Sequence, residues 1–268
     1  MGILNVTPDS FSDGGRFDTL PAAIDQAARM VAQGADLLDI GGESTRPGAG
    51  EVPEDAELER VVPVIERLRS RFECELSVDT SKPRVMTEAV AAGATMINDV
   101  CALQVEGAVE TAARLGVPVC LMHMQGRPRT MQSAPAYEDV TAEVGEFLAG
   151  RMRACVDAGM PADALLVDPG FGFGKTIEHN LQLLRDLDRI AMMGVPVLVG
   201  LSRKSMIGAL LDRPVDERLH ASVALALLAA QKGAAIVRVH DVGPTVDALR
   251  IWEAVDRRES DRERNIDG

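Results

Sequence analysis

The chain has 268 residues, of which 46% are hydrophobic, and this length suits one large α/β domain. The formal net charge of −13 argues against a nucleic-acid-binding protein, because such proteins present a basic face. No apolar run reaches the length of a membrane span, and we expect neither a membrane partner nor a cleaved leader. Four scattered cysteines without a CxxC pair predict free, buried thiols in a reducing cytoplasm.

One pattern repeats along the chain: a helical segment, a glycine, a short apolar strand and then a polar residue, as in "AQGADLLDIGGES" and "KGAAIVRVHD". This order is typical of parallel strands that are buried on both faces. In chain order, strands are predicted at residues 2–7, 36–42, 76–80, 96–100, 118–124, 165–170, 197–202 and 235–242. Helical segments are predicted at residues 21–33, 54–72, 82–92, 107–115, 138–158, 178–193, 216–232 and 244–258.

Eight such pairs predict an α/β fold, a single (β/α)8 TIM barrel with its active site at the carboxyl ends of the strands. A doubly wound open sheet is the alternative, but that fold does not require eight pairs. We expect the barrel to occupy residues 1–258 and the polar tail, residues 259–268, to fray. Because the first strand begins at once, the segment that often plugs the amino-terminal face of such barrels is expected to be either absent or trimmed.

The glycine-rich stretch "VDPGFGFGKT", residues 167–176, looks like a phosphate-binding loop but does not fit one. That loop needs a glycine five positions before Gly174, where this chain has Pro169. The even spacing of the three glycines also excludes the dinucleotide-binding fingerprint. We expect the glycines to let the backbone turn tightly beside a ligand, and Lys175 to face solvent.

Polar residues stand at the carboxyl end of every predicted strand. Asp79 and Asp168 lie inside apolar runs, and a buried carboxylate without a partner is costly, so both are predicted to be functional. The strand-end residues that we single out are Asn5, Thr7, Glu43, Asp79, Asn98, His123, Asp168, Ser202, Lys204, Arg238 and His240.

The pleat of a strand refines this set, because alternate residues share a face. Arg238 and His240 are therefore predicted to point the same way. Only one of Asn98 and Asp99 can face the interior, and we expect Asp99 to cap or pair with the next loop. Carboxylates can pair with adjacent N–H groups of a flat ring, as they do with arginine. Arg238 and His240, with Asn5 across the barrel mouth, suit an oxyanion such as a phosphate.

Eight stretches, one at each predicted strand end, form a distinctive set: "MGILNVTPDSFSDGG", "DIGGESTRPGA", "SVDTSKP", "MINDV", "LMHMQGRP", "DPGFGFGKT", "GLSRKSMIG" and "RVHDV". In these stretches the chain resembles the dihydropteroate synthase family over essentially its whole length. The resemblance implies a (β/α)8 barrel that joins 6-hydroxymethyl-7,8-dihydropterin pyrophosphate to 4-aminobenzoate. The products would be pyrophosphate and the folate precursor 7,8-dihydropteroate.

The resemblance also implies a role for each residue of the pterin site. Asp168 would bind the 2-amino and N3–H donors of the pterin, Lys204 its ring oxygen or N5, and Asp79 its N1/N8 edge. Asn5 would bind Mg²⁺, which is the expected cofactor. The catalytic residues would be Asp79, Asp168, Lys204 and Arg238, and the pterin pyrophosphate would be bound by Asp79, Asn98, Asp168, Lys204, Arg238 and His240.

The second substrate, 4-aminobenzoate, would be bordered by Phe11, Thr45, Pro47, Phe173 and Ser202. Sulfonamides, as mimics of 4-aminobenzoate, would compete for this surface. The loops at residues 8–20 and 43–53 are rich in glycine, proline and serine, and we expect them to close over this site and exclude water. Water would otherwise capture the cation that forms when pyrophosphate leaves before the amine attacks.

Two alternative functions, a methyltransferase and a non-catalytic paralogue, stay open at this point, and so does the role of one apolar helical segment. Corrinoid-dependent methyltransferases share the Asp-Asn-Asp positions but do not need the lysine of "SRKS" or the "RVH" pair. A non-catalytic pterin-binding paralogue should have lost a member of the set, and none is lost here. The family tends to form homodimers, and the apolar stretch "ASVALALLAA" suits either a dimer interface or burial against the sheet.

Overall fold

The structure is a computed structural model that describes residues 1–7, 19–44, 50–126 and 130–264. Eight parallel strands form one sheet in the order of the chain. They are β1 (Gly2–Asn5), β2 (Leu37–Gly41), β3 (Glu75–Asp79), β4 (Met96–Asp99), β5 (Val119–Met122), β6 (Leu165–Asp168), β7 (Val197–Val199) and β8 (Ala234–Val237). All eight predicted strands are therefore confirmed; β3 has its predicted length but is displaced by one residue, and the others are shorter than predicted.

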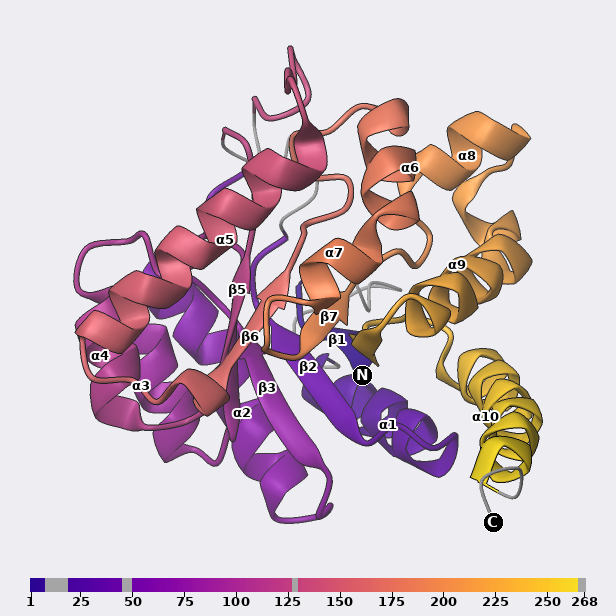
Figure 1. Ribbon diagram of the computed structural model, residues 1–268. Helices are drawn as coiled ribbons and strands as arrows, with labels where there is room; N and C mark the ends of the chain where they lie inside the picture. Colours follow the sequence, from indigo (N-terminus) through magenta and orange to yellow (C-terminus); the bar gives the residue numbers. More distant parts are fainter. Residues whose placement is uncertain (8–18, 45–49, 127–129, 265–268) are drawn as a thin grey trace.

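Helices lie around the strands, with the sheet in the centre of the molecule (Figure 1). They are α1 (Thr19–Ala32), α2 (Glu54–Arg69), α3 (Pro83–Ala91), α4 (Ala108–Leu115), α5 (Val140–Asp157), α6 (Ile177–Arg185), α7 (Leu187–Ala191), α8 (Ser205–Leu211), α9 (Leu219–Gln231) and α10 (Val242–Arg264). Short 3₁₀ turns occupy Ala162–Ala164 and Val215–Glu217.

Three helices differ from the prediction. The predicted segment 178–193 is divided into α6 and α7 at Asp186, whose φ of −103° and ψ of 17° leave helical values. The Asp186 carboxylate accepts hydrogen bonds from Thr141 of α5 and from Gln182, and these contacts hold the break. The short helix α8 after β7 was not predicted, because seven residues are too few to show a helical pattern. The last helix continues past residue 258 to Arg264, and residues 265–268 of the predicted tail lie outside the described part.

The sheet is curled, so that its first and last strands come together and give a TIM-barrel-like shape. A parallel bridge pairs Gly2 with Val239, which follows β8. The Ile3 N–H donates to the Val239 carbonyl at 3.0 Å, and the Val239 N–H donates to the Met1 carbonyl at 2.9 Å. Pairing is sparsest next to β7, where a single pair, Val167 with Val197, joins it to β6.

The core has two parts that together locate the site. Strand residues such as Leu38, Ile40 and Val78 pack outward against the helices in the main hydrophobic cluster. Inside the sheet, a smaller cluster is built from Met96, Cys120, Leu166 and Leu198. Asn98 and Asp168 follow Met96 and Leu166 by two residues on their strands, so the interior changes from apolar to polar toward the carboxyl ends.

The four cysteines are free, as predicted. Cys120 and Cys155 are buried, whereas Cys74 and Cys101 are only half-buried. None of the helices in the described ranges combines the length and hydrophobicity that a membrane span requires.

Candidate active site

An arginine and two carboxylates meet inside the sheet. Arg238 Nε donates to Asp39 Oδ2 at 2.5 Å, and its terminal nitrogen donates to Asp79 Oδ2 at 2.7 Å. Both carboxylates are buried. Burial raises the pKa of Asp79 to about 7, while the Arg238 guanidinium acts in the opposite direction. Burial alone lowers the pKa of Arg238, but the Asp39 and Asp79 carboxylates raise it above its usual value.

Asn98 joins this group from the neighbouring strand. It stands beside Asp79 in the β3–β4 register, and its side-chain N–H donates to Asp39 Oδ2 at 3.1 Å. The next residue, Asp99, points away and accepts from the Ser81 hydroxyl and from the backbone N–H groups of Cys101 and Leu103, both at 2.8 Å. The prediction that Asn98 faces the interior and Asp99 pairs with the following loop is confirmed.

Asp168 and Lys204 form a second charged group beside an aromatic ring. Asp168 is buried at the end of β6, and its Oδ1 accepts from the Gly170 N–H at 2.7 Å. Burial raises the pKa of Asp168. Burial also lowers the pKa of Lys204 to about 8, although the Asp168 carboxylate raises it. Lys204 Nζ lies 4.2 Å from the centroid of the Phe173 ring, which is a cation–π distance.

The turn that presents Lys204 is held by its neighbour, Arg203. Arg203 has a φ of 58°, an unusual value for a residue with a side chain. Its guanidinium forms two hydrogen bonds with Asp241, at 2.9 and 2.5 Å, and its N–H donates to the Ser222 hydroxyl. These contacts fix the backbone from which the Lys204 side chain starts.

The β6–α6 loop explains the spacing of its glycines. Gly170 and Gly174 have φ values of 68° and 62°. A Cβ at Gly170 would lie 1.9 Å from the His123 carbonyl oxygen, and one at Gly174 would lie 2.4 Å from the Gln125 carbonyl oxygen. The loop therefore packs directly on the backbone that follows β5, and side chains at these two positions are excluded.

Lys175 is buried, so the expectation that it faces solvent was wrong. Its Nζ lies 2.9 Å from His123 Nδ1 and donates to the carbonyls of Gly170 and Phe173 at 2.9 and 3.1 Å. Burial lowers the pKa of Lys175 to about 7, and burial together with the Lys175 charge lowers that of His123 to about 3. A neutral His123 can accept a hydrogen bond at Nδ1, so Lys175 fastens the loop to β5.

The remaining predicted residues lie at the rim or outside the described ranges. His240 donates its backbone N–H to the Ser202 hydroxyl at 3.2 Å, and its Nδ1 lies 3.0 Å from the same oxygen. Arg238 and His240 thus have different partners here. Phe11, Thr45 and Pro47 lie outside the described residues, as do residues 8–18 and 45–49 of the two long loops.

Asn5 lies close to Asp79 across Gly41. A Cβ built on Gly41 would be 3.7 Å from Asn5 Oδ1 and 3.6 Å from Asp79 Oδ2, so these oxygens border one glycine-lined space. Among the described residues there is no group of three or more His, Cys, Asp or Glu side chains that could hold a metal. Asp79 Oδ2 is already paired with Arg238, which leaves Asn5 Oδ1 as the amide oxygen that could serve as a ligand of Mg²⁺, an ion that commonly takes its other ligands from water and substrate phosphates.

Two features of the site were missed in the sequence. Asp39 stands in the apolar run "LLDIGG", which carries the same signal as the runs around Asp79 and Asp168. Lys82 forms ion pairs with Glu43 and with the buried Glu57. Glu43 also accepts from the Val52 N–H, so this cluster ties together both ends of the β2–α2 loop.

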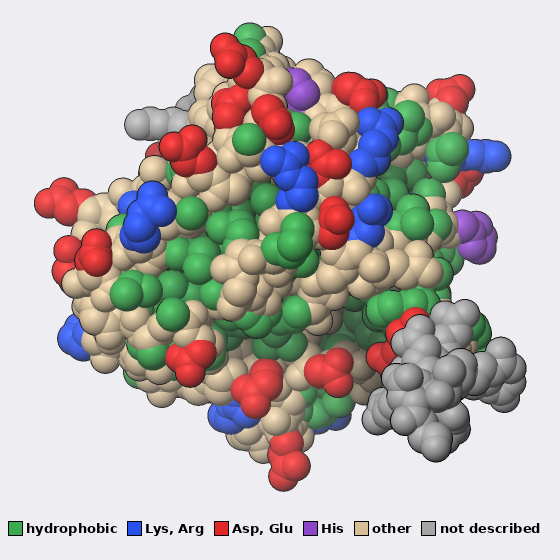
Figure 2. Space-filling model, viewed as in Figure 1, with side chains coloured by type: hydrophobic (Ala, Val, Ile, Leu, Met, Phe, Trp, Pro, Cys, Tyr) green, Lys and Arg blue, Asp and Glu red, His purple; other side chains and the backbone are tan. Residues whose placement is uncertain are grey.

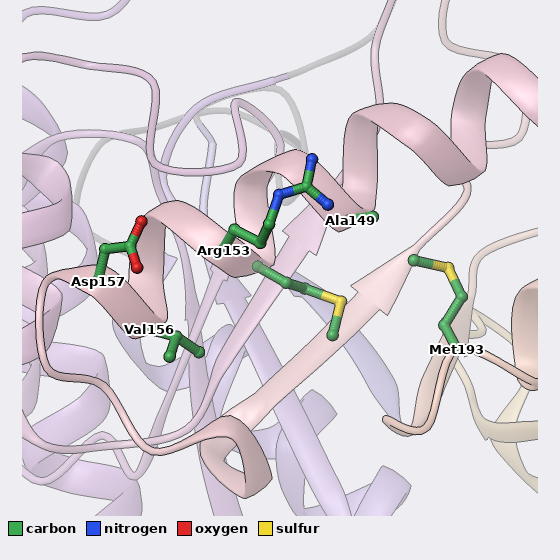
Figure 3. A pocket seen from close by; sticks show the side chains of 6 residues that line it. Ala149, Arg153, Val156, Asp157 and Met193 are labelled. Atoms are coloured by element: carbon green, nitrogen blue, oxygen red, sulfur yellow. The ribbon is translucent and has the colours of Figure 1, made fainter.

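A hollow elsewhere on the molecule contains none of these residues (Figure 3). It is lined by Ala149, Met152, Arg153, Val156, Asp157 and Met193. Asp157 ends α5 shortly before β6, and Met193 precedes β7, so the hollow lies toward the amino-terminal ends of these strands. The polar site is at the opposite ends.

Fold and site together define a TIM-barrel-like enzyme that binds a small polar molecule at the carboxyl ends of its strands. Residues 1–240 match the family described as "Pterin binding enzyme". The dihydropteroate synthase of Haemophilus influenzae is 57% identical over 95% of this chain and 92% of its own length. That of Escherichia coli K12 is 54% identical over 95% of this chain and 90% of its own.

Solved structures agree with this match. The Yersinia pestis dihydropteroate synthase in complex with a sulfonamide drug has a TM-score of 0.92 at 55% identity, covering 96% of this chain and 93% of its own. The Xanthomonas albilineans dihydropteroate synthase with 4-aminobenzoic acid has a TM-score of 0.91 at 57% identity, covering 95% and 92%. The chain belongs to the pterin-binding enzyme family, among its dihydropteroate synthases.

Proposed function

We propose that this protein condenses 6-hydroxymethyl-7,8-dihydropterin pyrophosphate with 4-aminobenzoate and releases pyrophosphate and 7,8-dihydropteroate, a step of folate biosynthesis. The observation that carries the proposal is the convergence of Asp79, Asn98, Asp168, Lys204 and Arg238 at the strand ends. The set stands in a chain that is 54 to 57% identical to named dihydropteroate synthases. The non-catalytic alternative has no observation in its favour.

Asp168 and Lys204 are suited to hold the pterin ring. Asp168 Oδ1 is occupied by the Gly170 N–H, and Oδ2 has no hydrogen bond within the described residues. That oxygen can accept from the 2-amino and N3–H groups of the pterin. Lys204, held over Phe173, reaches the ring oxygen or N5. Asp79 lies along the N1/N8 edge, and Asn98 completes the pocket.

The reaction breaks the bond between the pterin methylene and the pyrophosphate oxygen and forms a bond to the nitrogen of 4-aminobenzoate. Pyrophosphate leaves first, because an aryl amine is a modest nucleophile. The positive charge that remains on the methylene and dihydropterin is stabilised by the ionised Asp79 and Asp168 carboxylates. The amine then attacks and loses a proton, and no side chain forms a covalent bond.

The pyrophosphate is neutralised by Arg238, from inside the sheet, and by His240. Mg²⁺, with Asn5 as its protein ligand, would add positive charge to the leaving group when it is bound. The nearness of Asn5 Oδ1 to the Asp79 carboxylate supports this location.

The 4-aminobenzoate would lie above the pterin, bordered by Phe173 and Ser202 and by Phe11, Thr45 and Pro47 of the two long loops. Relatives have been solved with 4-aminobenzoic acid and with a sulfonamide drug, which supports binding of both kinds of compound by this chain. We expect sulfonamides to inhibit this enzyme in competition with 4-aminobenzoate.

Three properties of the whole protein belong to the proposal. A fully closed (β/α)8 barrel is supported by the bridge from Gly2 to Val239. Localisation in the cytoplasm is supported by four free cysteines. A homodimer is supported by large apolar side chains that α9 and α10 leave exposed, including Leu228, Ile251 and Val255.

The test is pyrophosphate release from the purified protein with the dihydropterin pyrophosphate and Mg²⁺, with and without 4-aminobenzoate. We expect release that depends on 4-aminobenzoate, dihydropteroate as product, and a fall in kcat/KM of about 100-fold in Asp168→Asn. Asp163→Asn is the control, because Asp163 is exposed at the other end of β6. Pterin binding without turnover in the wild type would instead establish the non-catalytic alternative.

A further inference from the structure

Asp39 is a buried carboxylate that connects two residues of the pterin site. It lies in the middle of β2 and is 0% exposed. Its Oδ2 accepts from Asn98 of β4 and from Arg238, which follows β8. In the order of the sheet these strands are separated by three others on either path, so only a group in the interior can join them.

The depth of Asp39 shows that it supports the site from below. Asp39 pairs with Ser77 in the β2–β3 register, whereas Asp79 lies two residues further toward the carboxyl end of β3. Asp39 is therefore one interior layer deeper than Asp79. Met96, a member of the interior apolar cluster, pairs with Ser77 and so lies in the same register as Asp39. A pterin that reaches Asp79 and Asn98 would not need to touch Asp39.

Stability of the fold does not explain an acid at this position. Asp39 Oδ1 is buried and has no hydrogen-bond partner among the described residues. A buried charge with an unpaired oxygen is costly, and apolar replacements of buried ion pairs are often neutral or stabilising. The retention of this carboxylate is better explained by what it orients.

We propose that Asp39 is a positioning residue that fixes the orientation of the Asn98 amide and of the Arg238 guanidinium. A carboxylate can only accept hydrogen bonds, so it selects the amide orientation in which Asn98 turns its N–H group down and its oxygen toward the site. In the same way it holds Arg238 by Nε, which leaves the terminal nitrogens for Asp79 and for substrate. This inference rests on the proposed function of the site.

Asp39→Asn tests the proposal, because an amide has nearly the same shape but can present either a donor or an acceptor to Asn98. We expect the KM for dihydropterin pyrophosphate to rise about tenfold and kcat to fall, since a small misplacement of binding groups is costly in catalysis. The KM for 4-aminobenzoate should change less than about twofold, because the site proposed for that substrate does not include Asn98 or Arg238. Ser77→Ala is the matched control, since it removes from the same layer a buried hydroxyl that has no partner in the described part of the chain.

A double-mutant cycle with Asn98→Ala separates positioning from a general structural effect. If Asp39 acts through Asn98, Asp39→Asn should raise the KM much less in the Asn98→Ala background than in the wild type. Equal effects in the two backgrounds would overturn the proposal. So would a lower kcat with an unchanged KM for the pterin substrate, because that result indicates only a smaller fraction of active protein.

Loss of activity in Asp39→Asn must be distinguished from loss of folding and from failure of the proposed reaction itself. Melting followed by circular dichroism reports whether Asp39→Asn folds, and Asp39→Glu, which keeps the charge but moves it, is the second variant. If neither variant folds, Asp39 is a structural residue and the proposal fails. The wild-type assay is run alongside, because absence of dihydropteroate there would contradict the proposed function itself and not the role of Asp39.

Discussion

Asp79 is the residue whose protonation state matters most for the proposed reaction. Asp79 must be ionised to stabilise a positive charge. Burial nevertheless raises its pKa to about 7, although the positive charge of Arg238 lowers it. We therefore expect kcat/KM for the pterin substrate to rise with pH through about 7, because the neutral acid predominates below that value. Between about pH 4 and 7, Asp79 is protonated in the folded state but ionised in the unfolded state. The titration of Asp79 therefore makes the free energy of unfolding fall as the pH rises from about 4 to about 7.

The measurement is a profile of kcat/KM between about pH 5.5 and 8.5. Asp79→Asn should have low activity at every pH and should lose the ascending limb. Asp163→Asn, in the exposed 3₁₀ turn before β6, should keep the limb. A wild-type profile that is flat down to about pH 5 would show that Asp79 remains ionised through the Arg238 pair.

Single residues also show how far the sequence can be interpreted. The positions of Asp79, Asn98 and Asp168 at the ends of buried strands could be predicted, because each is a polar residue that closes an apolar run. Asp39 has the same signal, but it stands two residues before the end of β2, and strand ends cannot be located that finely from pattern alone. Lys175 was assigned wrongly, because its burial depends on the β6–α6 loop folding over β5, which is a contact between distant parts of the chain.

At the scale of elements, the β6–α6 loop depends on glycine for two separate reasons. Gly170 has a φ of 68°, which disfavours any side chain, and its Cβ would also meet the His123 carbonyl oxygen at 1.9 Å. Gly116 has the same φ of 68° but has nothing within 4 Å of its Cβ position. Substituting alanine at each glycine therefore separates two costs. At Gly116 only the left-handed backbone conformation destabilises the fold, whereas at Gly170 the clash with the His123 carbonyl oxygen adds to it.

We expect Gly116→Ala to lower the free energy of unfolding by about 1 kcal/mol, the cost of the left-handed conformation alone. Gly170→Ala should lower it by about 3 kcal/mol or more and should also reduce activity, because Asp168 is bonded to the Gly170 N–H. Urea unfolding of both variants measures the difference. Equal losses would mean that the loop can move away from β5 without cost.

The elements themselves were predictable wherever the pattern was long. Eight strands and most helices follow from apolar runs and glycine punctuation, because parallel strands are buried on both faces. The helix α8 and the break at Asp186 could not be predicted. The first is too short to show a period, and the second depends on a hydrogen bond from Thr141 of another helix.

At the scale of the whole molecule, exposed apolar side chains occur in several places, and two of them are candidate surfaces for a second copy. Hydrophobic side chains spread across the middle of the face in Figure 2, where α5 lies and where the hollow is lined by Val156 and Met193. The second place is the pair α9 and α10, which pack together on one side of the molecule (Figure 1) and expose Leu228, Ile251 and Val255. The family resemblance favours α9 and α10 as the surface between two copies.

Charge substitutions on the two surfaces test this choice. Ile251→Glu, at a side chain that is 69% exposed, should leave the monomer folded but weaken the dimer strongly, because a charge would be buried without a partner. Val156→Glu is the matched control on α5, at a side chain that is 45% exposed, and should leave the mass unchanged. Sedimentation equilibrium measures the mass against the 28.6 kDa of a single chain. A wild-type mass of one chain would contradict the homodimer, and dissociation by Val156→Glu alone would place the interface on α5.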